Sequence, residues 1–265
     1  MSNYFKELTI NELYKLFKNK INYIYIAIIF CAILTSFFGI KMLDSTNSAR
    51  SGYSYMLFSL QTISTTIMPL LLLLFSANMI TSEKIFGTIR NILVVGCSKS
   101  QFLFSKVITC LIFQIFIMVM AMLTTIVIAY FNFGFGNISE DGIIILSCHQ
   151  FWFQFIFAYS LLALVLFAVT TFGIMLSTFC RNSASAITSA IGIYIMLESV
   201  KSKLHIENLI YSSYIEYPLN VVSELVEGFH AAWGPKLLYL IFISTLWIFF
   251  SLSASFIIIK KLEFK

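Results

Sequence analysis

The sequence predicts an all-α integral membrane protein of 265 residues, with six transmembrane helices in one domain. Hydrophobic residues make up 59% of the chain and charged residues only 11%, whereas a soluble domain is about 45–50% apolar and about 25% charged. So little charge cannot cover a water-exposed surface, but it suits one that faces lipid. The net charge is +5, yet the basic residues flank apolar runs, so we expect a lipid bilayer and no nucleic acid as partner.

Six stretches of the chain approach the length of about 20 apolar residues that a helix needs to cross the hydrocarbon core. They lie near Ile21–Ile40, Met56–Ile80, Val107–Phe133, Phe153–Phe179, Ser183–Leu197 and Leu237–Ile259. The fifth is the weakest, because only residues 182–197 lack charge before Glu198. Either Glu198 extends toward the interface, or the helix and the bilayer adapt locally.

Basic residues are divided unevenly between the two sides of these spans. The side that carries both termini holds 12 Lys and Arg residues, and the opposite side holds 5. Short loops rich in Lys and Arg stay in the cytoplasm. Both termini are therefore predicted to be cytoplasmic, in agreement with an even number of spans.

The N-terminal segment, residues 1–20, is predicted to contain an amphipathic helix. Thr9-Ile10-Asn11-Glu12 is a capping-box pattern that would open a helix over Thr9–Lys20. Leu13, Leu16 and Phe17 share one face of that helix. We expect the helix to lie on the inner membrane surface before the first span, with a solvated tail as the alternative.

The loop between the second and third spans is predicted to form a cytoplasmic helix over residues 82–95. Ser82 is a suitable N-cap, Glu83 is favourable in a first turn, and Gly96 can end the helix in a left-handed conformation. Residues 98–101, Ser-Lys-Ser-Gln, form another capping-box pattern, which would open the helix that enters the third span. Because the third span is placed from Val107, Lys106 is counted among the basic residues of the loop.

The segment between the fifth and sixth spans, residues 201–236, carries apolar residues at helical spacing on both sides of Pro218. This pattern predicts two short extracellular helices that are broken near the proline. They could cap the outer mouth of the bundle. A solvated loop is the alternative, which the apolar content disfavours.

Motifs of a catalyst or of a nucleotide site do not occur in the sequence. There is no Gly-x-x-x-x-Gly-Lys-[Ser/Thr] loop, and the three His and five Cys lack metal-ligand spacing. No ionisable residue falls in the middle of a predicted span, which argues against a proton-driven carrier. We therefore expect no catalytic residue, no metal site and no cofactor bound to this chain.

Polar uncharged residues mark two of the predicted spans. The candidates are Gln61, Thr62, Thr65 and Thr66 in the second span, and Ser185 and Ser189 in the fifth. The first set recurs at helical spacing and is followed by Pro69, which would kink the helix. The second set lies among small residues at four-residue spacing, which lets helices approach closely. These residues either pack helices together or line a path between two copies of the chain.

Residues 83–90, Glu-Lys-Ile-Phe-Gly-Thr-Ile-Arg, resemble the E-x-x-x-G-T-[I/L]-[R/K] pattern that follows the second span in ABC-2 type transporter permeases. Residues 172–177 and the Arg181-Asn182 turn are similar to the family's end of the fourth span. The resemblance covers essentially the whole chain. It implies that two six-span copies pair with two separate ATPase subunits, which bind ATP and Mg²⁺, at the bacterial cytoplasmic membrane.

The resemblance also implies roles for particular residues. Residues 82–95 would be the coupling helix, seated in a cleft of the ATPase, and residues 1–20 would be the elbow helix against the same partner. The coupling residues would be Glu83, Phe86, Gly87, Thr88 and Arg90, and the elbow residues Leu13, Leu16 and Phe17. Glu83 and Arg90 would supply charge to the interface, Gly87 would permit close approach, and Thr88 would form a hydrogen bond.

Within this family, the compact size resembles the permeases of bacitracin and lantibiotic immunity and of phenol-soluble modulin export. The likeness implies export of amphipathic or antimicrobial peptides, or of hydrophobic drugs. An interaction protein that sequesters a peptide without moving it is the alternative from another class. A membrane enzyme would require polar catalytic groups clustered at one depth, and a channel would conduct without nucleotide.

Overall fold

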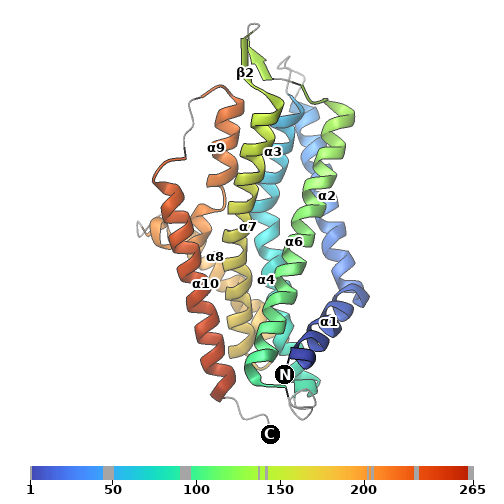
Figure 1. Cartoon of the computed structure of the whole chain (residues 1–265), viewed down its shortest axis with the longest axis vertical. Coiled ribbons are helices and arrows are strands. Elements are labelled where there is room, and N and C mark those ends of the chain that lie inside the picture. The colour runs from blue at the N-terminus through green and yellow to red at the C-terminus, as the bar shows by residue number, and fades with distance from the viewer. Residues whose placement is uncertain are drawn as a thin grey trace.

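The computed structural model is an upright bundle of long helices (Figure 1). It describes residues 2–43, 51–89, 97–136, 138–140, 143–201, 203, 206–229 and 233–261. The helices are α1 (Ser2–Lys18), α2 (Lys20–Leu43), α3 (Gly52–Thr62), α4 (Met68–Ile85), α6 (Lys99–Asn132), α7 (Cys148–Phe179), α8 (Ser183–Lys201), α9 (Tyr217–Val226) and α10 (Lys236–Lys261).

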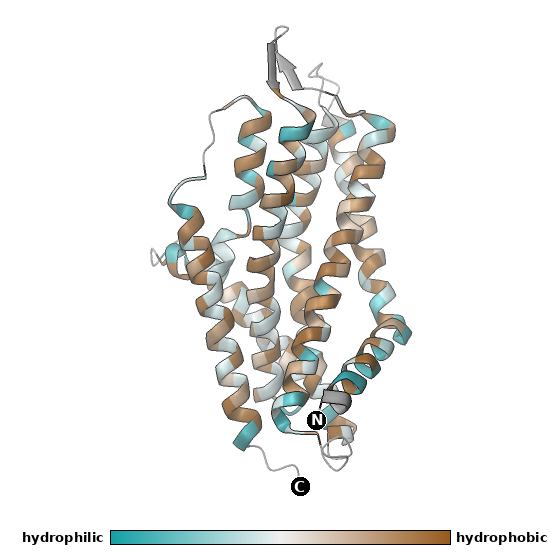
Figure 2. Cartoon of the chain, viewed as in Figure 1, coloured by the Kyte–Doolittle hydropathy of each residue, from teal (hydrophilic) through white to brown (hydrophobic). Residues whose placement is uncertain are grey.

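Six helical segments of the described chain are long and apolar enough to cross a membrane, which confirms the predicted fold class. The second of them joins α3 and α4 into one run, Gly52–Ile85. Hydrophobic residues follow the length of these helices and hydrophilic residues gather toward their ends (Figure 2). The start of α1 and the end of α10 lie at the same end of the bundle, as an even number of spans requires (Figure 1).

The centre of the bundle is the contact between α4 and α7. These two helices are mostly buried inside the molecule, whereas α2, α8 and α10 are mostly exposed. Gly173 lets the two backbones approach, because a Cβ at this position would lie 1.9 Å from Ser76 Oγ. One turn further, Ser177 Oγ accepts hydrogen bonds from the backbone N–H groups of Ile80 and Thr81 at 3.0 and 3.1 Å. Small residues at this contact thus allow the backbones of α4 and α7 to lie close together, as is usual between membrane helices.

A π-helical segment, Ile63–Ile67, joins α3 to α4 at the place where Pro69 predicted a kink. Pro69 has no N–H to donate to the fourth residue before it. The chain absorbs this loss by a wider turn, in which the N–H of Met68 bonds to the carbonyl of Ile63. Such single π turns are typical of a helix that is interrupted at a functional or strained position.

The N-terminal helix begins at Ser2, so the prediction that Thr9 opens it is wrong. Thr9 lies inside α1, where its hydroxyl donates to the carbonyl of Phe5 at 2.9 Å. Asn19 separates α1 from α2 and accepts a hydrogen bond from the N–H of Ile21. Asn22 donates to the carbonyl of Leu16 at 2.6 Å, which ties the two helices together at this corner. The helix α1 leaves the bundle axis at an angle (Figure 1).

The predicted capping box at Ser98 and Gln101 is confirmed at the start of α6. A second capping box, Ser147 with Gln150, opens α7. Between α6 and α7 the chain forms a short antiparallel hairpin of β1 (Ile138–Glu140) and β2 (Ile143–Leu146), which the sequence did not predict.

The described residues between α8 and α10 contain one α-helix, α9, where two were predicted. Two 3₁₀ turns, Glu207–Leu209 and Tyr211–Tyr214, precede α9. Pro218 lies in the first turn of α9, where a missing N–H costs nothing, and so starts a helix instead of breaking one. The helix packs lengthwise against α3 and α7 and does not lie across the ends of the bundle (Figure 1).

Gly173→Ala is expected to destabilise the protein by about 1–3 kcal/mol, because the added methyl group requires Ser76 or the whole of α4 to move. The measurement is the thermal unfolding midpoint in detergent. Gly192→Ala on α8 is the matched control, since a Cβ there would meet no atom within 4 Å. A midpoint for Gly173→Ala equal to or above that of the control would contradict the close contact of α4 with α7.

Candidate functional site

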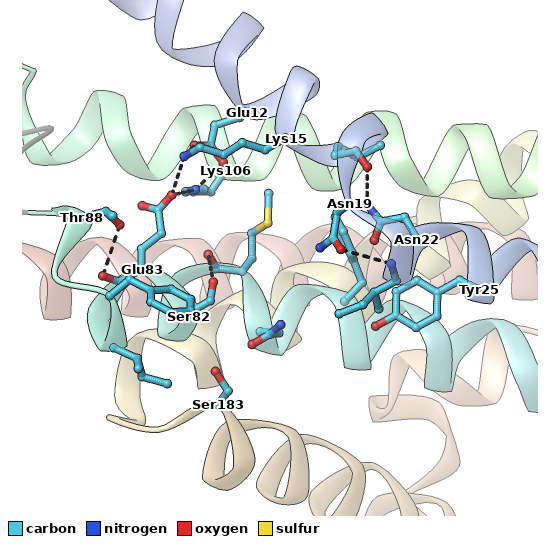
Figure 3. Close-up of a pocket in the computed structure, with 17 residues that line it drawn as sticks. Glu12, Lys15, Asn19, Asn22, Tyr25, Ser82, Glu83, Thr88, Lys106 and Ser183 are labelled. Atoms are coloured by element: carbon cyan, nitrogen blue, oxygen red, sulfur yellow. Dashed lines mark hydrogen bonds and ion pairs between the residues drawn. The ribbon is translucent and has the colours of Figure 1, made fainter.

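Four charged residues from three helices meet at the end of the bundle where α4 ends. This ion-pair cluster consists of Glu12 and Lys15 on α1, Glu83 on α4 and Lys106 on α6 (Figure 3). Lys106 Nζ lies 2.6 Å from Glu83 Oε1 and also pairs with Glu12 Oε2. Lys15 Nζ lies 2.8 Å from Glu12 Oε1 and 3.2 Å from Glu83 Oε1.

Burial makes this cluster energetically important. The Lys106 side chain is only 1% exposed, and those of Glu12 and Glu83 are also buried, whereas that of Lys15 is 48% exposed. A buried ammonium is tolerated when carboxylates surround it, and removing one partner leaves an uncompensated charge. The cluster therefore holds α1 against α4 and α6.

The pKa of the Glu12 carboxyl reflects this balance. Burial alone would raise that pKa, but the charges and hydrogen bonds of Lys106 and Lys15 outweigh burial and lower it. Burial would likewise lower the pKa of the Lys15 ammonium, but Glu12 and Glu83 raise it. Both groups are thus held in their charged forms.

Lys84, the neighbour of Glu83, ties α4 to α7. Its ammonium donates to the backbone carbonyls of Ser177, Thr178 and Cys180 at 3.1, 2.6 and 2.9 Å. The last carbonyls of a helix have no partner within the helix and favour a cation. Glu83 and Lys84 therefore fix the end of α4 to α1 and α6 on one side and to α7 on the other.

The end of α4 differs from the predicted coupling helix. Ser82 lies inside α4, which runs to Ile85, so its assignment as an N-cap is wrong. Gly87 has φ +66° and lies in the turn that follows, a conformation that favours glycine. Thr88 Oγ1 donates to the carbonyl of Glu83 at 3.4 Å and closes this turn. Residues 90–96, including Arg90 and Gly96, lie outside the described residues.

The exposed part of this turn is apolar. Phe86 is 78% exposed and its neighbour Ile85 is also exposed, and we call these two residues the apolar tip. Glu83 was predicted to offer charge to a partner, but its carboxylate lies inside the ion-pair cluster. The side chains that the described part of this motif presents to the outside are therefore those of the apolar tip.

A cleft of about 580 Å³ adjoins the cluster, between α1 and α2 on one side and α4 and α8 on the other (Figure 3). Its polar lining includes Asn19, Asn78, Ser82 and Ser183, and its apolar lining includes Phe86. The cleft thus opens next to the apolar tip, on a surface with both polar and apolar character.

The predicted elbow residues lie where α1 meets the bundle. Leu16 is buried and lines the cleft, and Leu13 is half-buried. Phe17 is half-exposed and meets the ring of Phe116 on α6 edge-on, with the centroids 5.9 Å apart. One face of α1 is therefore fastened to α6, in addition to the cluster.

The predicted path residues do not line the cleft beside the ion-pair cluster. Gln61 bonds with Asn220 of α9, and the hydroxyls of Thr62, Thr65 and Thr66 donate to backbone carbonyls one turn back. Ser185 is exposed, and Ser189 lies 3.7 Å from the Cys180 sulfur at the end of α7. Thr62, Thr66 and Ser185 leave polar groups on the exposed surface of the bundle.

Sequence reasoning missed Lys106 and did not link Glu12 to Glu83. Lys106 was assigned to a loop, but α6 begins at Lys99 and places it about two turns inside a helix. The available signal was the capping box at Ser98, which puts Lys106 on the apolar helix that follows. Its acidic partners are distant in sequence and are found only in the folded chain.

The fold and this site together define a multi-pass membrane protein in which Glu83 and Lys84, at the end of α4, are bonded to α1, α6 and α7. The sequence profile of the ABC-2 family transporter proteins matches residues 8–199, and the chain belongs to this family. It is a membrane permease component of an ABC transporter, a class that lacks an ATPase domain of its own and works with a partner ATPase subunit. No curated protein matches the chain.

Lys106→Ala is expected to lower the free energy of unfolding by about 3–5 kcal/mol, because it leaves two buried carboxylates without their shared cation. Combining Lys106→Met with Glu12→Gln should cost less than the sum of the two single changes, since the pair interacts directly. Thermal unfolding in detergent measures both effects. Lys6→Ala on the exposed part of α1 is the control. If the two changes in free energy of unfolding are fully additive in the double variant, the pairing of Lys106 with Glu12 does not contribute to stability.

Acid should weaken the contribution of Glu12. Its folded pKa lies below the ordinary 4.5, so the stabilisation is fully present above about pH 4.5 and is lost as the pH falls through the folded pKa. The difference in unfolding midpoint between the natural chain and Glu12→Gln should stay constant from pH 8 to 5 and shrink below. Glu7→Gln, at an exposed position of the same helix, should show no such difference. A difference that persists unchanged at pH 3 would contradict the assignment.

Proposed function

We propose that this chain is the permease subunit of an ATP-driven exporter that moves amphipathic peptides or hydrophobic drugs out of the cell. Two copies would assemble with two ATPase subunits, which bind ATP and Mg²⁺. The observation that carries the proposal is the apolar tip, because it projects from a turn whose neighbouring residues are bonded to α1, α6 and α7.

The contacts around the tip support a role in coupling to the ATPase. Force applied at Phe86 reaches Glu83 and Lys84 within one turn of helix. Glu83 passes it to α1 and α6 through the ion-pair cluster, and Lys84 passes it to the end of α7. A partner that grips the tip and the adjacent cleft could therefore move several spans together. Glu83, Gly87 and Thr88 shape this element, and Phe86 contacts the partner.

The exposed polar groups on the second and fifth spans support a path between two copies. Thr62 and Thr66 lie exposed beside the π-helical segment, and Ser185 lies exposed near the start of α8. Their hydroxyls donate to backbone carbonyls, so these three side chains form a mildly polar surface and carry no charge. Such a surface suits an amphipathic cargo better than a small ion.

An interaction protein that binds a peptide without moving it is the other candidate. Such a protein would also bind the peptide at its exposed helices, but it would need no contact that couples it to an ATPase. The two functions differ in the effect of nucleotide: an exporter clears its cargo only when the partner hydrolyses ATP, whereas a sequestering protein protects without hydrolysis.

Phe86→Ala is expected to reduce ATP-dependent export and the stimulation of the ATPase by at least fivefold, with little change in thermal stability, because the side chain is 78% exposed. The assay uses proteoliposomes with the permease and its co-purified ATPase. Phe131→Ala is the matched control, since Phe131 is 79% exposed at the opposite end of α6.

The proposal fails if the purified permease exports peptide without any ATPase that carries a phosphate-binding loop. It also fails if a hydrolysis-deficient ATPase leaves clearance of the peptide unchanged. Equal loss of coupling in the Phe86 and Phe131 variants would remove the assigned role of the apolar tip.

A further inference from the structure

A second group of polar residues lies deep among the spans, where α8 gives way to the 3₁₀ turns. This polar junction consists of Tyr194 and Glu198 on α8 and of Tyr211, Ser212 and Ser213 in the turn before α9. The Tyr211 ring contacts Phe172 of α7 and Trp247 of α10, with centroids 6.3 and 5.1 Å apart. Trp247 lies near the middle of α10, so the junction lies beside the middle of a membrane-spanning helix.

Four buried polar atoms of this junction have no hydrogen-bond partner among the described residues. They are Glu198 Oε1, Tyr211 OH, Ser212 Oγ and Ser213 Oγ. Tyr211 is completely buried and Ser212 nearly so. Buried polar groups are nearly always satisfied in folded proteins, so a concentration of unsatisfied groups in one place requires an occupant or a function.

Electrostatics favours a cation as that occupant. The Glu198 carboxylate pairs with Lys201 through Oε2 at 2.6 Å and leaves Oε1 free. The stretch from Glu198 to Glu216 carries three Glu and two Lys residues, so it is acidic on balance. Burial raises the pKa of the Tyr211 hydroxyl, so the hydroxyl stays neutral. The N–H of Ile206 bonds to the carbonyl of Lys201 at 3.1 Å, which holds the start of the 3₁₀ turns at the end of α8, one turn after Glu198.

The part of the junction on α8 is partly exposed at the surface of the bundle. The Glu198 side chain is 31% exposed and that of Lys201 25%. On the same helix, Ser185, Thr188, Gly192 and Ser199 are exposed and give α8 a mildly polar outer surface. Carboxylates at this depth of a membrane protein are costly and commonly mark a ligand pathway.

We propose that the polar junction binds the primary ammonium group of a basic amphipathic cargo. Glu198 Oε1 is the counter-ion, the Tyr211 hydroxyl oxygen is a further acceptor, and the rings of Phe172 and Trp247 form the apolar wall beside them. The inference rests on the proposed export function, whose cargo class it narrows from amphipathic molecules to those that carry an amine.

The chemistry of the acceptors sets the order of preference. A primary ammonium has three N–H donors and can satisfy a carboxylate and a hydroxyl at once. A quaternary ammonium keeps the charge but donates no hydrogen bond. A neutral alcohol donates without charge, and an anion is repelled by Glu198. Buried water is the competing occupant, and it would satisfy the same atoms regardless of any ligand charge.

The test measures binding of dodecylamine at pH 7 to the purified chain in phosphatidylcholine nanodiscs, without ATPase or nucleotide. The readout is the rise in thermal unfolding midpoint with ligand concentration. We expect dodecylamine to raise the midpoint saturably, dodecyltrimethylammonium to act at least tenfold more weakly, and dodecanol to show no saturable effect. Equal responses to all three ligands would overturn the proposal.

Tyr211→Phe is the decisive variant, because its hydroxyl has no partner in the unliganded chain. Its removal should leave the midpoint without ligand unchanged or higher and weaken dodecylamine binding at least fivefold. Tyr159→Phe is the matched control: Tyr159 donates to the carbonyl of Met118 at 2.7 Å, so this change should lower the unliganded midpoint and leave amine binding intact. If Tyr211→Phe instead lowers the midpoint without ligand and leaves amine binding intact, the Tyr211 hydroxyl bonds to buried water or supports packing, and the proposal is overturned.

Changes in charge test the counter-ion in both directions. Glu198→Gln should abolish the preference for the amine over the alcohol, whereas Lys201→Gln frees the second carboxylate oxygen and should tighten amine binding. Weaker binding in Lys201→Gln would contradict the assignment. None of these measurements requires ATP, so loss of amine binding overturns this inference alone. Failure of ATPase coupling overturns the export function and leaves the binding result standing.

Discussion

A lysine ammonium that is buried between two carboxylates governs how this protein is held together at one end. Lys106 joins Glu12 and Glu83, and so joins the N-terminal helix α1 to two membrane-spanning helices. A charge in such a position is stable only while both partners remain in place. The position of α1, the end of α4 and the start of α6 are therefore determined together, and none of the three can shift without breaking ion pairs.

The contact between α4 and α7 provides the second constraint. Gly173 brings the two backbones together, Ser177 bonds to N–H groups of α4, and Lys84 fastens the end of α7. Consecutive residues of one motif thus serve different partners: Glu83 the cluster, Lys84 α7, and the apolar tip a separate subunit under the proposed function. Phe172, further along α7, contacts Tyr211 of the polar junction. The end of α4 and the polar junction therefore both contact α7.

The segment between α8 and α10 packs among the membrane-spanning helices. Because α9 packs along α3 and α7 and bonds to Gln61 through Asn220, the 3₁₀ turns before it lie beside α7 and α10. Polar groups that a membrane loop would normally expose to water are buried among aromatic rings instead. Non-helical backbone at such a level is tolerated where protein surrounds it or where it lines a cavity. The burial of this turn is thus the structural reason that unsatisfied hydroxyls occur there.

The sequence by itself determined the class of fold, the six spans, the capping box at Ser98 and the position of the interruption near Pro69, because apolar length, caps and proline act within one stretch of chain. It also carried the family motif at residues 83–90, on which the resemblance rested. It placed the start of α1 too late and took Ser82 for an N-cap, and it did not predict that Glu83 pairs with Lys15 and Lys106. The reason is that local patterns of capping and charge occur in helix interiors as well as at helix ends. Only the tertiary structure decided that Lys106 is buried between Glu12 and Glu83, and that the Tyr211 ring contacts Phe172 and Trp247. The physical reason is that an ion pair across helices depends on packing between segments far apart in the chain, which no local pattern specifies.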